Sequence, residues 1–431
     1  MRISTSMMFD MGTSTIQRHQ SELADLQQKV AAGRRVLKPS DDPISAAAAT
    51  TLRQASGVNT QYASNAESAQ ASLALEEDAL AQATRVLQDV KTLAVNAGNA
   101  SLQNSDRASI AASLKGLYAE LLGIANRTDA SGQYLFSGLQ GGTQPFAESA
   151  PGVVAYAGDE GVRLLQVGPQ RRIAVADNGA EIFQRVREGN GTFVATVAST
   201  NTGTVVADMG TVTNGQAWAN PANSGDYTIR FDVDAAGLTT YDIVDTASGQ
   251  SMLTGAAAGA GPYARAYQPG MTIALQRQAG DPSGAPFDAG VQLGVSGVPK
   301  DGDTIQVRQA GTQDVFKSLN SLIKTLETGT SAAPSSQAAY QNGLNHALNN
   351  ADRALDQVLT TRSSVGARLQ EIDAVTTTTQ GLAVQYDEEL SRLQDLDYAK
   401  ALTDLTKRQF NLEAAQKSFM LVSRLNLFDL L

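Results

Sequence analysis

The chain contains no cysteine and only two histidines among its 431 residues. The absence of cysteine excludes disulfide bonds and metal sites built on thiolates. His19 and His346 are far apart in the sequence, and neither lies at metal-ligand spacing from a second histidine. A histidine triad or a histidine-bound metal is therefore not expected. The sequence predicts no catalytic residue, no cofactor and no metal ligand, and we interpret the protein as a non-enzyme.

Positive charge and long apolar runs are also scarce. The chain carries 33 Lys and Arg against 43 Asp and Glu, a net charge of −10, and its basic residues form no patch in the sequence. This balance argues against a nucleic-acid partner. Because no run of about 18 apolar residues occurs, no membrane insertion is expected. Residues 1–20 lack the basic and apolar regions of a secretory signal peptide.

What the chain does have is apolar residues at heptad spacing near both ends. Such a repeat keeps facing a neighbouring helix along its whole length. A lone N-terminal helix cannot bury its apolar stripe without a neighbour, so we interpret the repeats as a surface for subunit assembly. Packing within one chain is the alternative, because amphipathic helices commonly form the core of a bundle. This assembly seam consists of Phe9, Ile16, Leu23, Val30, Leu402, Leu405, Leu412 and Phe419.

Helix boundaries near the N-terminus are marked by local chemistry. A first helix is expected over roughly 5–32, and Gly33 is expected to end it. Asp42 can cap a second helix by accepting hydrogen bonds from its first N–H groups. Pro43 suits the first helical position, where a missing N–H costs nothing. This second helix should run to about Gly98.

The middle of the chain changes to a strand pattern. Short β-branched and aromatic runs alternate with Gly, Asn and Asp clusters, and Gln133–Phe136 also resembles a strand. The sequence therefore predicts an α+β multidomain fold, with an elongated coiled-coil helical domain built from both terminal regions and an inserted β-rich domain. The predicted segments are 1–40 and 395–431 as assembly helices that are disordered in the monomer, 41–144 and 312–394 as the two halves of the helical domain, and 145–311 as the β-rich domain.

Acidic clusters are interpreted as structural. Glu76, Glu77 and Asp78 are consecutive, and neighbouring helix positions point about 100° apart. They cannot share one site, so a solvated helix face is expected. Asp301 and Asp303 flank a glycine, but the rest of a calcium-binding loop is missing, and a turn is expected there.

Several segments together resemble the bacterial flagellin superfamily, and within it the proteins of the hook–filament junction. Filament flagellin is the alternative. Flagellins usually carry a Lys-Asp-Asp-Ala-Ala-Gly type sequence where this chain has Lys38–Pro43, and they tend to end in a Leu-Leu-Arg-like tail, whereas this chain ends in Leu427–Leu431. Both departures favour a junction protein. The matching segments are 1–47, from MRIST to PISAA, together with 87–117, 126–146, 362–373 and 390–419.

The resemblance implies a secreted structural protein of the bacterial flagellum, located at the hook–filament junction. It implies assembly as a ring between hook-associated protein 1 and the flagellin filament. It also implies passage through the flagellar type III export apparatus and binding of an export chaperone to the C-terminal helix. The residues expected to bind the chaperone are Leu412, Phe419, Val422 and Leu425. A soluble enzyme or ligand-binding protein is the third interpretation, but no polar cluster recommends it.

Overall fold

The computed structural model describes residues 5–282, 286–331 and 333–428. The chain forms two compact units. The first unit consists of Met1–Glu67, Gln166–Arg171 and Asp373–Leu431. The second consists of Ser68–Leu165 and Arg172–Ile372. Two long helices, α2 (Pro43–Ala97) and α7 (Pro334–Gln394), contribute residues to both units.

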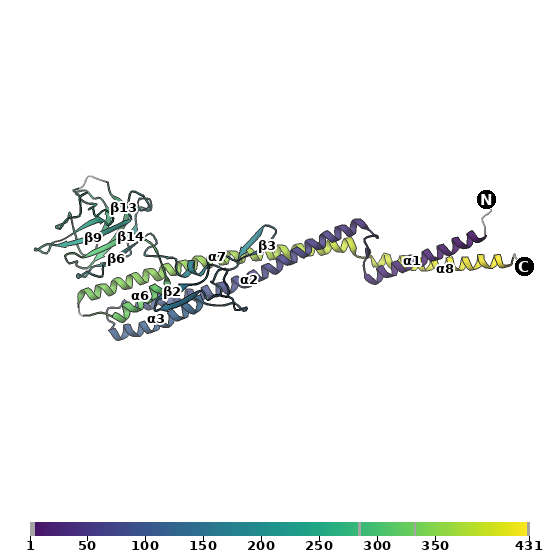
Figure 1. Cartoon of the computed structure of the whole chain (residues 1–431), viewed down its shortest axis with the longest axis horizontal. Coiled ribbons are helices and arrows are strands. Elements are labelled where there is room, and N and C mark those ends of the chain that lie inside the picture. Colours follow the sequence, from purple (N-terminus) through teal and green to yellow (C-terminus); the bar gives the residue numbers. More distant parts are fainter. Residues whose placement is uncertain (1–4, 283–285, 332, 429–431) are drawn as a thin grey trace. The chain divides into compact units, whose positions relative to one another are not determined.

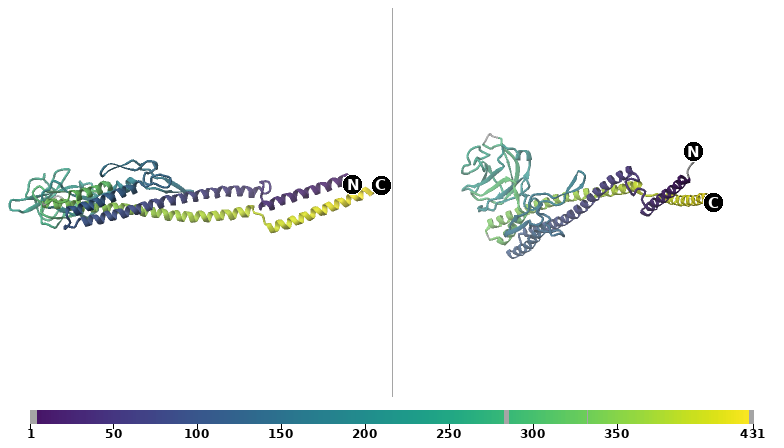
Figure 2. Two further views of the ribbon diagram at one scale, coloured as in Figure 1. Left: turned by 90° about the horizontal axis from the view of Figure 1, so that it is seen from below. Right: turned by 45° about the vertical axis from the view of Figure 1, so that its right-hand side comes forward.

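In the first unit, α1 (Thr5–Ala32) lies beside α8 (Tyr398–Phe428), as Figures 1 and 2 show. The pairing is antiparallel, because Phe9 near the start of α1 contacts Phe419 near the end of α8, whereas Arg34 just after α1 pairs with Asp395 just before α8. The intramolecular partner of the N-terminal repeat is thus the C-terminal repeat.

The predicted boundaries of α1 and α2 are confirmed. Gly33 has a φ of 68°, a left-handed conformation that glycine adopts without strain, and α1 ends just before it. Asp42 Oδ1 accepts a hydrogen bond from the backbone N–H of Ser45 at 3.0 Å, and α2 begins at Pro43. This carboxylate satisfies one of the N–H groups that a helix start leaves unpaired.

In the second unit, α2 and α7 run antiparallel. Tyr340 donates a hydrogen bond to the carbonyl of Ala97 at 2.8 Å, and Arg362 forms an ion pair with Glu77 at 2.6 Å. Alanine is frequent on the contact face of α2, which allows the helices to approach closely. The fully buried positions of α2 in this unit include Ala69, Leu73, Leu80, Ala83, Leu87, Val90 and Ala94.

Two shorter helices, α3 (Asn104–Ala125) and α6 (Val315–Thr328), pack together in the same unit. Lys115 of α3 and Glu327 of α6 form an ion pair at 2.5 Å. Among the described residues, α3 alone is long and apolar enough to cross a membrane by length and composition. A single such helix is weak evidence of a membrane span, and α3 uses part of its apolar surface to contact α6.

An aromatic cluster joins these helices to a set of short elements. Phe316 of α6 lies 5.6 Å from Phe146 and 6.1 Å from Phe183, measured between ring centroids, and all three are fully buried. Phe183 also packs edge-on against Phe136 at 5.6 Å. The cluster takes Phe146 from β1 (Phe146–Ala150) and Phe183 from α4 (Gly179–Phe183). The other short elements of the region are β2 (Val153–Tyr156), β3 (Leu164–Gly168), β4 (Arg171–Ala174), β5 (Val186–Arg187) and β15 (Thr312–Gln313), and β3 and β4 carry residues of both units.

The prediction of a strand at Gln133–Phe136 is wrong. The segment consists of turns, with a single bridge between Thr128 and Tyr134. Asp129 Oδ1 accepts backbone hydrogen bonds from Ser131 at 2.8 Å and from Gln133 at 2.9 Å, which closes the chain into a turn. A large apolar residue stands at position 136 because its ring packs in the aromatic cluster, not because the segment is a strand.

The rest of the β-rich region is a sandwich of two antiparallel sheets. One has the strand order β11-β10-β9-β14-β6, and the other has β12-β13-β7, with β8 also pairing with β13. Side chains from both sheets, such as Ile229 and Leu293, fill one core, which also holds Trp218. The elements are β6 (Phe193–Val197), β7 (Val206–Ala207), β8 (Thr211–Val212), α5 (Gly215–Trp218), β9 (Asp226–Val233), β10 (Thr239–Asp245), β11 (Arg265–Ala266), β12 (Met271–Gln276), β13 (Asp288–Ser296) and β14 (Thr304–Gln309).

The acidic pair at Asp301 and Asp303 forms a turn, as predicted. Asp303 is buried, and its carboxylate accepts backbone hydrogen bonds from Thr202 at 2.8 Å, Gly203 at 3.0 Å and Lys300 at 2.9 Å. Its oxygens are therefore already engaged by backbone N–H groups that would otherwise lack partners.

Candidate assembly surface

The predicted assembly seam lies on the α1–α8 pair of the first unit. None of its residues is fully buried: Phe9 is 53% exposed and Leu402 is 52% exposed. The others, Ile16, Leu23, Val30, Leu405, Leu412 and Phe419, are half-buried. Two helices alone cannot enclose an apolar stripe, because each helix leaves most of its circumference to solvent. The pairing within the chain therefore covers the seam only in part.

The pair is held in part by an aromatic contact, a close approach at Gly12 and an ion pair. Phe9 and Phe419 stack in a tilted arrangement with ring centroids 4.9 Å apart. Gly12 allows close approach, since a Cβ atom at this position would lie 2.6 Å from Cδ2 of Phe419. Arg408 forms an ion pair with Glu22 at 2.6 Å. The ion pair is partly solvated and contributes little energy, about 0–1 kcal/mol. The aromatic contact buries more apolar surface and is less sensitive to solvent than the ion pair.

Other large apolar side chains of the pair point to solvent. Phe410 is 70% exposed and Leu421 is 64% exposed, against an ordinary preference of such residues for burial. On α1 the described side chains of this kind are confined to residues 7–11, whereas on α8 they are spread along the helix. An exposed apolar surface of this kind is typical of a protein interaction site. Among the side chains that the structure describes, the exposed large apolar residues of α1 and α8 are Met7, Met8, Phe9, Met11, Tyr398, Leu402, Phe410, Met420 and Leu421.

Of the predicted chaperone-binding residues, Leu412 and Phe419 lie half-buried on α8. The side chains of Val422 and Leu425 lie outside those that the structure describes. The role of all four stays a prediction.

A hydrogen-bonded joint links the α1–α8 pair to the adjoining parts of α2 and α7 within the first unit. The Arg35 guanidinium donates to Asp42 Oδ2 at 3.1 Å and to the carbonyl of Leu393 at 2.9 Å. The backbone N–H of Arg35 donates to the carbonyl of Gln394 at 2.7 Å. The N–H of Leu396 returns a bond to the carbonyl of Gly33 at 3.1 Å. These bonds connect the turn between α1 and α2 to the turn between α7 and α8.

Two carboxylates set the electrostatics of this joint. The backbone N–H of Lys38 and then that of Leu37 donate to Asp41 and hold the pKa of its carboxyl below the usual value. The hydroxyl and backbone N–H of Ser45 lower the pKa of Asp42 to about 2. Both groups are therefore ionised at neutral pH. The sequence identified Asp42 as a helix cap, but the role of Arg35 depends on residues some 350 positions away and carries no local signal.

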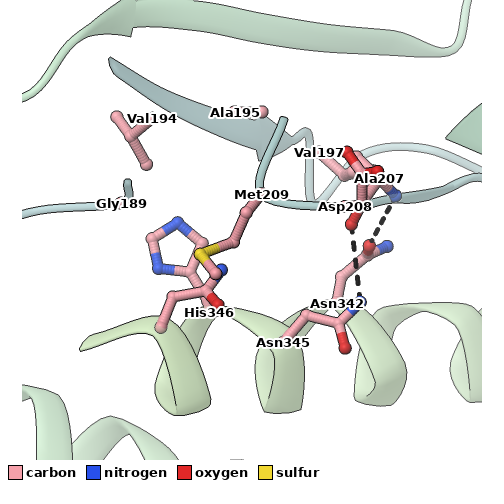
Figure 3. Close-up of a pocket in the computed structure, with 11 residues that line it drawn as sticks. Gly189, Val194, Ala195, Val197, Ala207, Asp208, Met209, Asn342, Asn345 and His346 are labelled. Atoms are coloured by element: carbon pink, nitrogen blue, oxygen red, sulfur yellow. Dashed lines mark hydrogen bonds between the residues drawn. The ribbon is translucent and has the colours of Figure 1, made fainter. Parts of the chain in front are cut away.

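A cavity of about 20 Å³ lies where α7 meets β6 and β7, and Figure 3 shows Met209 beside His346 there. This volume fits a single water molecule. Burial lowers the pKa of His346, so the imidazole is neutral at pH 7. Within the described ranges, no group of three His, Cys, Asp or Glu could hold a metal ion.

The same region attaches the sandwich to α7. Asn342 accepts a hydrogen bond from the N–H of Ala207 at 3.2 Å and donates to the carbonyl of Val205 at 2.8 Å. Asn345 donates to the carbonyl of Ala207 at 3.4 Å, and both bonds to Ala207 are drawn in Figure 3. The two amides thus substitute for a neighbouring strand and cover the edge of β7.

One acidic residue contradicts the expectation of a solvated helix face. Glu76 is only 1% exposed, and Glu77 is paired with Arg362. Only Asp78, which pairs with Arg127 and is half-exposed, fits the expectation in part. Spacing within α2 could not reveal this, because the segment before α4 that covers Glu76 is distant in sequence.

The comparisons with known proteins agree with this arrangement. The model of the bacterial flagellin N-terminal helical region matches residues 3–141, and that of the C-terminal helical region matches residues 348–431. Together they account for more than half of the chain. The chain belongs to the bacterial flagellin family. Its predicted fold class, with long terminal helices and a β-rich region between them, is confirmed.

Within that family, the chain is similar to flagellar hook-associated protein 3. It is 39% identical to that protein of Salmonella typhimurium over 186 residues, and 37% identical to that of Escherichia coli over 186 residues. Each match covers 43% of this chain and 58% of the relative, so the chain spans little more than half the length of these curated relatives.

Solved structures extend the likeness. The crystal structure of hook-associated protein 3 from Legionella pneumophila has a TM-score of 0.70 and 28% identity, and the match covers 80% of this chain and 98% of that one. The crystal structure of FlgL from Xanthomonas campestris has a TM-score of 0.66 and 30% identity, with coverage of 79% and 99%.

Proposed function

We propose that this protein is a structural adaptor of the bacterial flagellum that assembles as a ring at the junction between hook and filament. The observation that carries the proposal is the partly covered apolar seam on α1 and α8. The similarity to hook-associated protein 3, and to a solved structure named as the flagellar junction protein from Legionella pneumophila, supports it. The proposed role is structural: the chain acts by packing its seam against neighbouring copies.

In this proposal, the α1–α8 pairs of neighbouring copies cover one another. Fully burying a large apolar side chain contributes roughly 1.5–3 kcal/mol. Phe9 and Leu402 are about half-exposed, so each would gain roughly 1 kcal/mol from a neighbouring copy. The other seam residues, which are half-buried, would add smaller gains of the same kind, and together these gains offset the cost of association. Hook-associated protein 1 would contact one side of the ring and flagellin the other.

The role of the seam can be tested with a matched pair of substitutions in a strain that lacks the gene. Phe9→Asp places a charge in the proposed interface, whereas Leu238→Asp makes the corresponding change at an equally exposed position of the sandwich; both residues are 53% exposed. We expect Phe9→Asp to fail to restore filaments and Leu238→Asp to restore them. Filaments of normal number with Phe9→Asp would refute the proposed interface.

Filament flagellin is the second candidate, since it shares the helical family models. Deletion of the gene separates the two. A junction adaptor leaves hooks without filaments and releases flagellin monomers into the medium. If the chain were itself the filament protein, its band would dominate sheared filaments and no other flagellin would appear in the medium. Immunogold labelling confined to the distal end of the hook would agree only with the adaptor.

We further propose that α8 has two successive partners. Before export, a flagellar chaperone would cover its apolar residues by binding the helix in a groove. After passage through the type III export apparatus, neighbouring copies would cover them. Leu412→Asp and Phe419→Asp should both reduce capture of the chain by the purified chaperone and reduce assembly, while Leu238→Asp changes neither. Normal chaperone binding together with complete filaments would show that the two partners do not share this surface.

A further inference from the structure

The second unit contains a buried carboxyl group that the proposed function does not use. Glu76 of α2 is 1% exposed. Its Oε1 accepts a hydrogen bond from the backbone N–H of Asp177 at 3.0 Å, and its Oε2 has no hydrogen-bond partner in the described part of the chain. An ionised carboxylate that is buried with one oxygen unpaired is strongly disfavoured. The neutral, protonated form suits this position better.

The charged groups around Glu76 come from two further elements. Asp177, in the segment between β4 and α4, forms an ion pair with Arg368 of α7. Arg368 also donates to the carbonyl of Ala174 at 3.2 Å, at the end of β4. Among the described residues, Arg368 is the cation that pairs with Asp177 and also acts electrostatically on Glu76.

The other charges nearby have partners of their own. On α2, Glu77 pairs with Arg362 at 2.6 Å, and Asp78 pairs with Arg127 at 2.6 Å. If Glu76 ionises, the cluster with Asp177 and Arg368 holds two negative charges against one positive charge. Burial, and next the charge of Asp177, raise the pKa of Glu76 to about 8.

We propose that Glu76, Asp177 and Arg368 form a proton-dependent clamp, which holds the segment Ala174–Asn178 against α2 and α7 while Glu76 is protonated. The clamp is tightest in acid and loosens as the medium becomes mildly alkaline. A surface depression of about 370 Å³, lined in part by Asp177 and Asn178, lies beside the cluster and gives solvent protons a route to it. Because Phe183 remains anchored in the aromatic cluster, the opening is confined to the segment before α4.

The sign of the pH effect follows from linkage. The folded chain holds the Glu76 proton up to about pH 8, whereas an exposed glutamate releases it near the ordinary value of 4.5. The stabilising contribution of the proton is complete below 4.5 and is lost as the pH rises to about 8. Over that interval, opening of the clamp should become about tenfold more favourable per pH unit.

Hydrogen exchange of the intact chain, measured by mass spectrometry on peptides that contain residues 174–178, tests the clamp. Wild type is compared at each pH with Glu76→Gln, which copies the size and the neutrality of the protonated acid, so that the intrinsic exchange chemistry cancels in the ratio. We expect this ratio to rise about tenfold per unit between about pH 5 and pH 7 and to level off above about pH 8. The matched control Glu67→Gln, at an exposed position of α2, should behave like wild type.

Infrared spectroscopy supplies a readout that does not depend on the variant's folding. At neutral pH, wild type should show the stretching band of a protonated carboxyl group, which disappears on alkalinisation and is missing in Glu76→Gln. An exchange ratio that stays constant with pH would overturn the clamp. So would the absence of the protonated band from the wild-type protein.

Discussion

Gly12 offers a sharp test of how α1 and α8 pack. Alanine is favoured over glycine in a helix interior by roughly 1 kcal/mol, so Gly12→Ala would stabilise an isolated helix. In the structure, however, the added Cβ would lie 2.6 Å from Cδ2 and 2.9 Å from Cε2 of Phe419. Either the helices separate or the Phe419 ring turns away, and a turned ring gives up the contact with Phe9.

The size of the effect follows from these alternatives. Overpacking at a close contact costs about 1–3 kcal/mol, and losing an aromatic pair costs about 0.5–1.5 kcal/mol. Gly57 on α2 is the matched control, because nothing lies within 4 Å of a Cβ atom added there. We expect Gly57→Ala to stabilise its helix by about 1 kcal/mol, and Gly12→Ala to fall short of that gain by about 1–3 kcal/mol.

Hydrogen exchange resolved by peptide is the suitable assay, because a global unfolding curve does not report the ends of the chain. Protection of α1 peptides should fall or stay level in Gly12→Ala, whereas protection of α2 peptides should rise in Gly57→Ala. Combining Gly12→Ala with Phe419→Leu should recover the gain, since the ring edge is gone. If Gly12→Ala raises protection as much as Gly57→Ala does, and Phe419→Leu does not alter its effect, the close packing described for α1 and α8 is refuted.

Three further outcomes are expected. Phe316→Ala should destabilise the helical part of the second unit by about 3–5 kcal/mol. In urea unfolding, the transition followed by circular dichroism should therefore shift more than the transition followed by the fluorescence of Trp218, the sole tryptophan, which lies in the sandwich core. The control Phe410→Ala, at an exposed position, should shift neither transition. Asn342→Ala removes the side-chain amide that bonds to Ala207 N–H and Val205 C=O. Hydrogen exchange at the edge of β7 should therefore accelerate by the equivalent of about 1–3 kcal/mol. Unchanged exchange there would contradict the bridging role of the amide. The pKa of Asp42 is lowered to about 2, so its stabilisation of the joint is present above pH 3.8 and is lost as the pH falls through about 2. In wild type, the amides at the start of α2 should lose their protection from hydrogen exchange over that interval. The variant Asp42→Asn should lack this transition.

Local chemistry made the helix ends predictable from the sequence. Gly33 and the Asp42-Pro43 pair act on their immediate neighbours, so the pattern alone located the end of α1 and the start of α2.

Long-range partners could not be predicted in the same way. β14 lies between β6 and β9, and its pairing with β6 joins Ile305 to Val197. Nothing near either residue specifies that register. The burial of Glu76 is of the same kind, since Asp177 covers it from 101 residues away. The heptad repeats showed that α1 and α8 need apolar partners, but they did not reveal that each is in part the other's partner.

The pairing of α1 with α8 also sets the order in which the chain can fold. The sandwich core draws its residues from the continuous stretch between Phe193 and Val307, so it can close as soon as that stretch is available. By contrast, the contact between Phe9 and Phe419 can form only after residue 419 has been made. Synthesis proceeds at about 5–20 residues per second, so the intervening 410 positions (419 − 9) take roughly 20–80 s. During that interval α1 lacks the α8 partner that it has in the structure, although it is made before the sandwich.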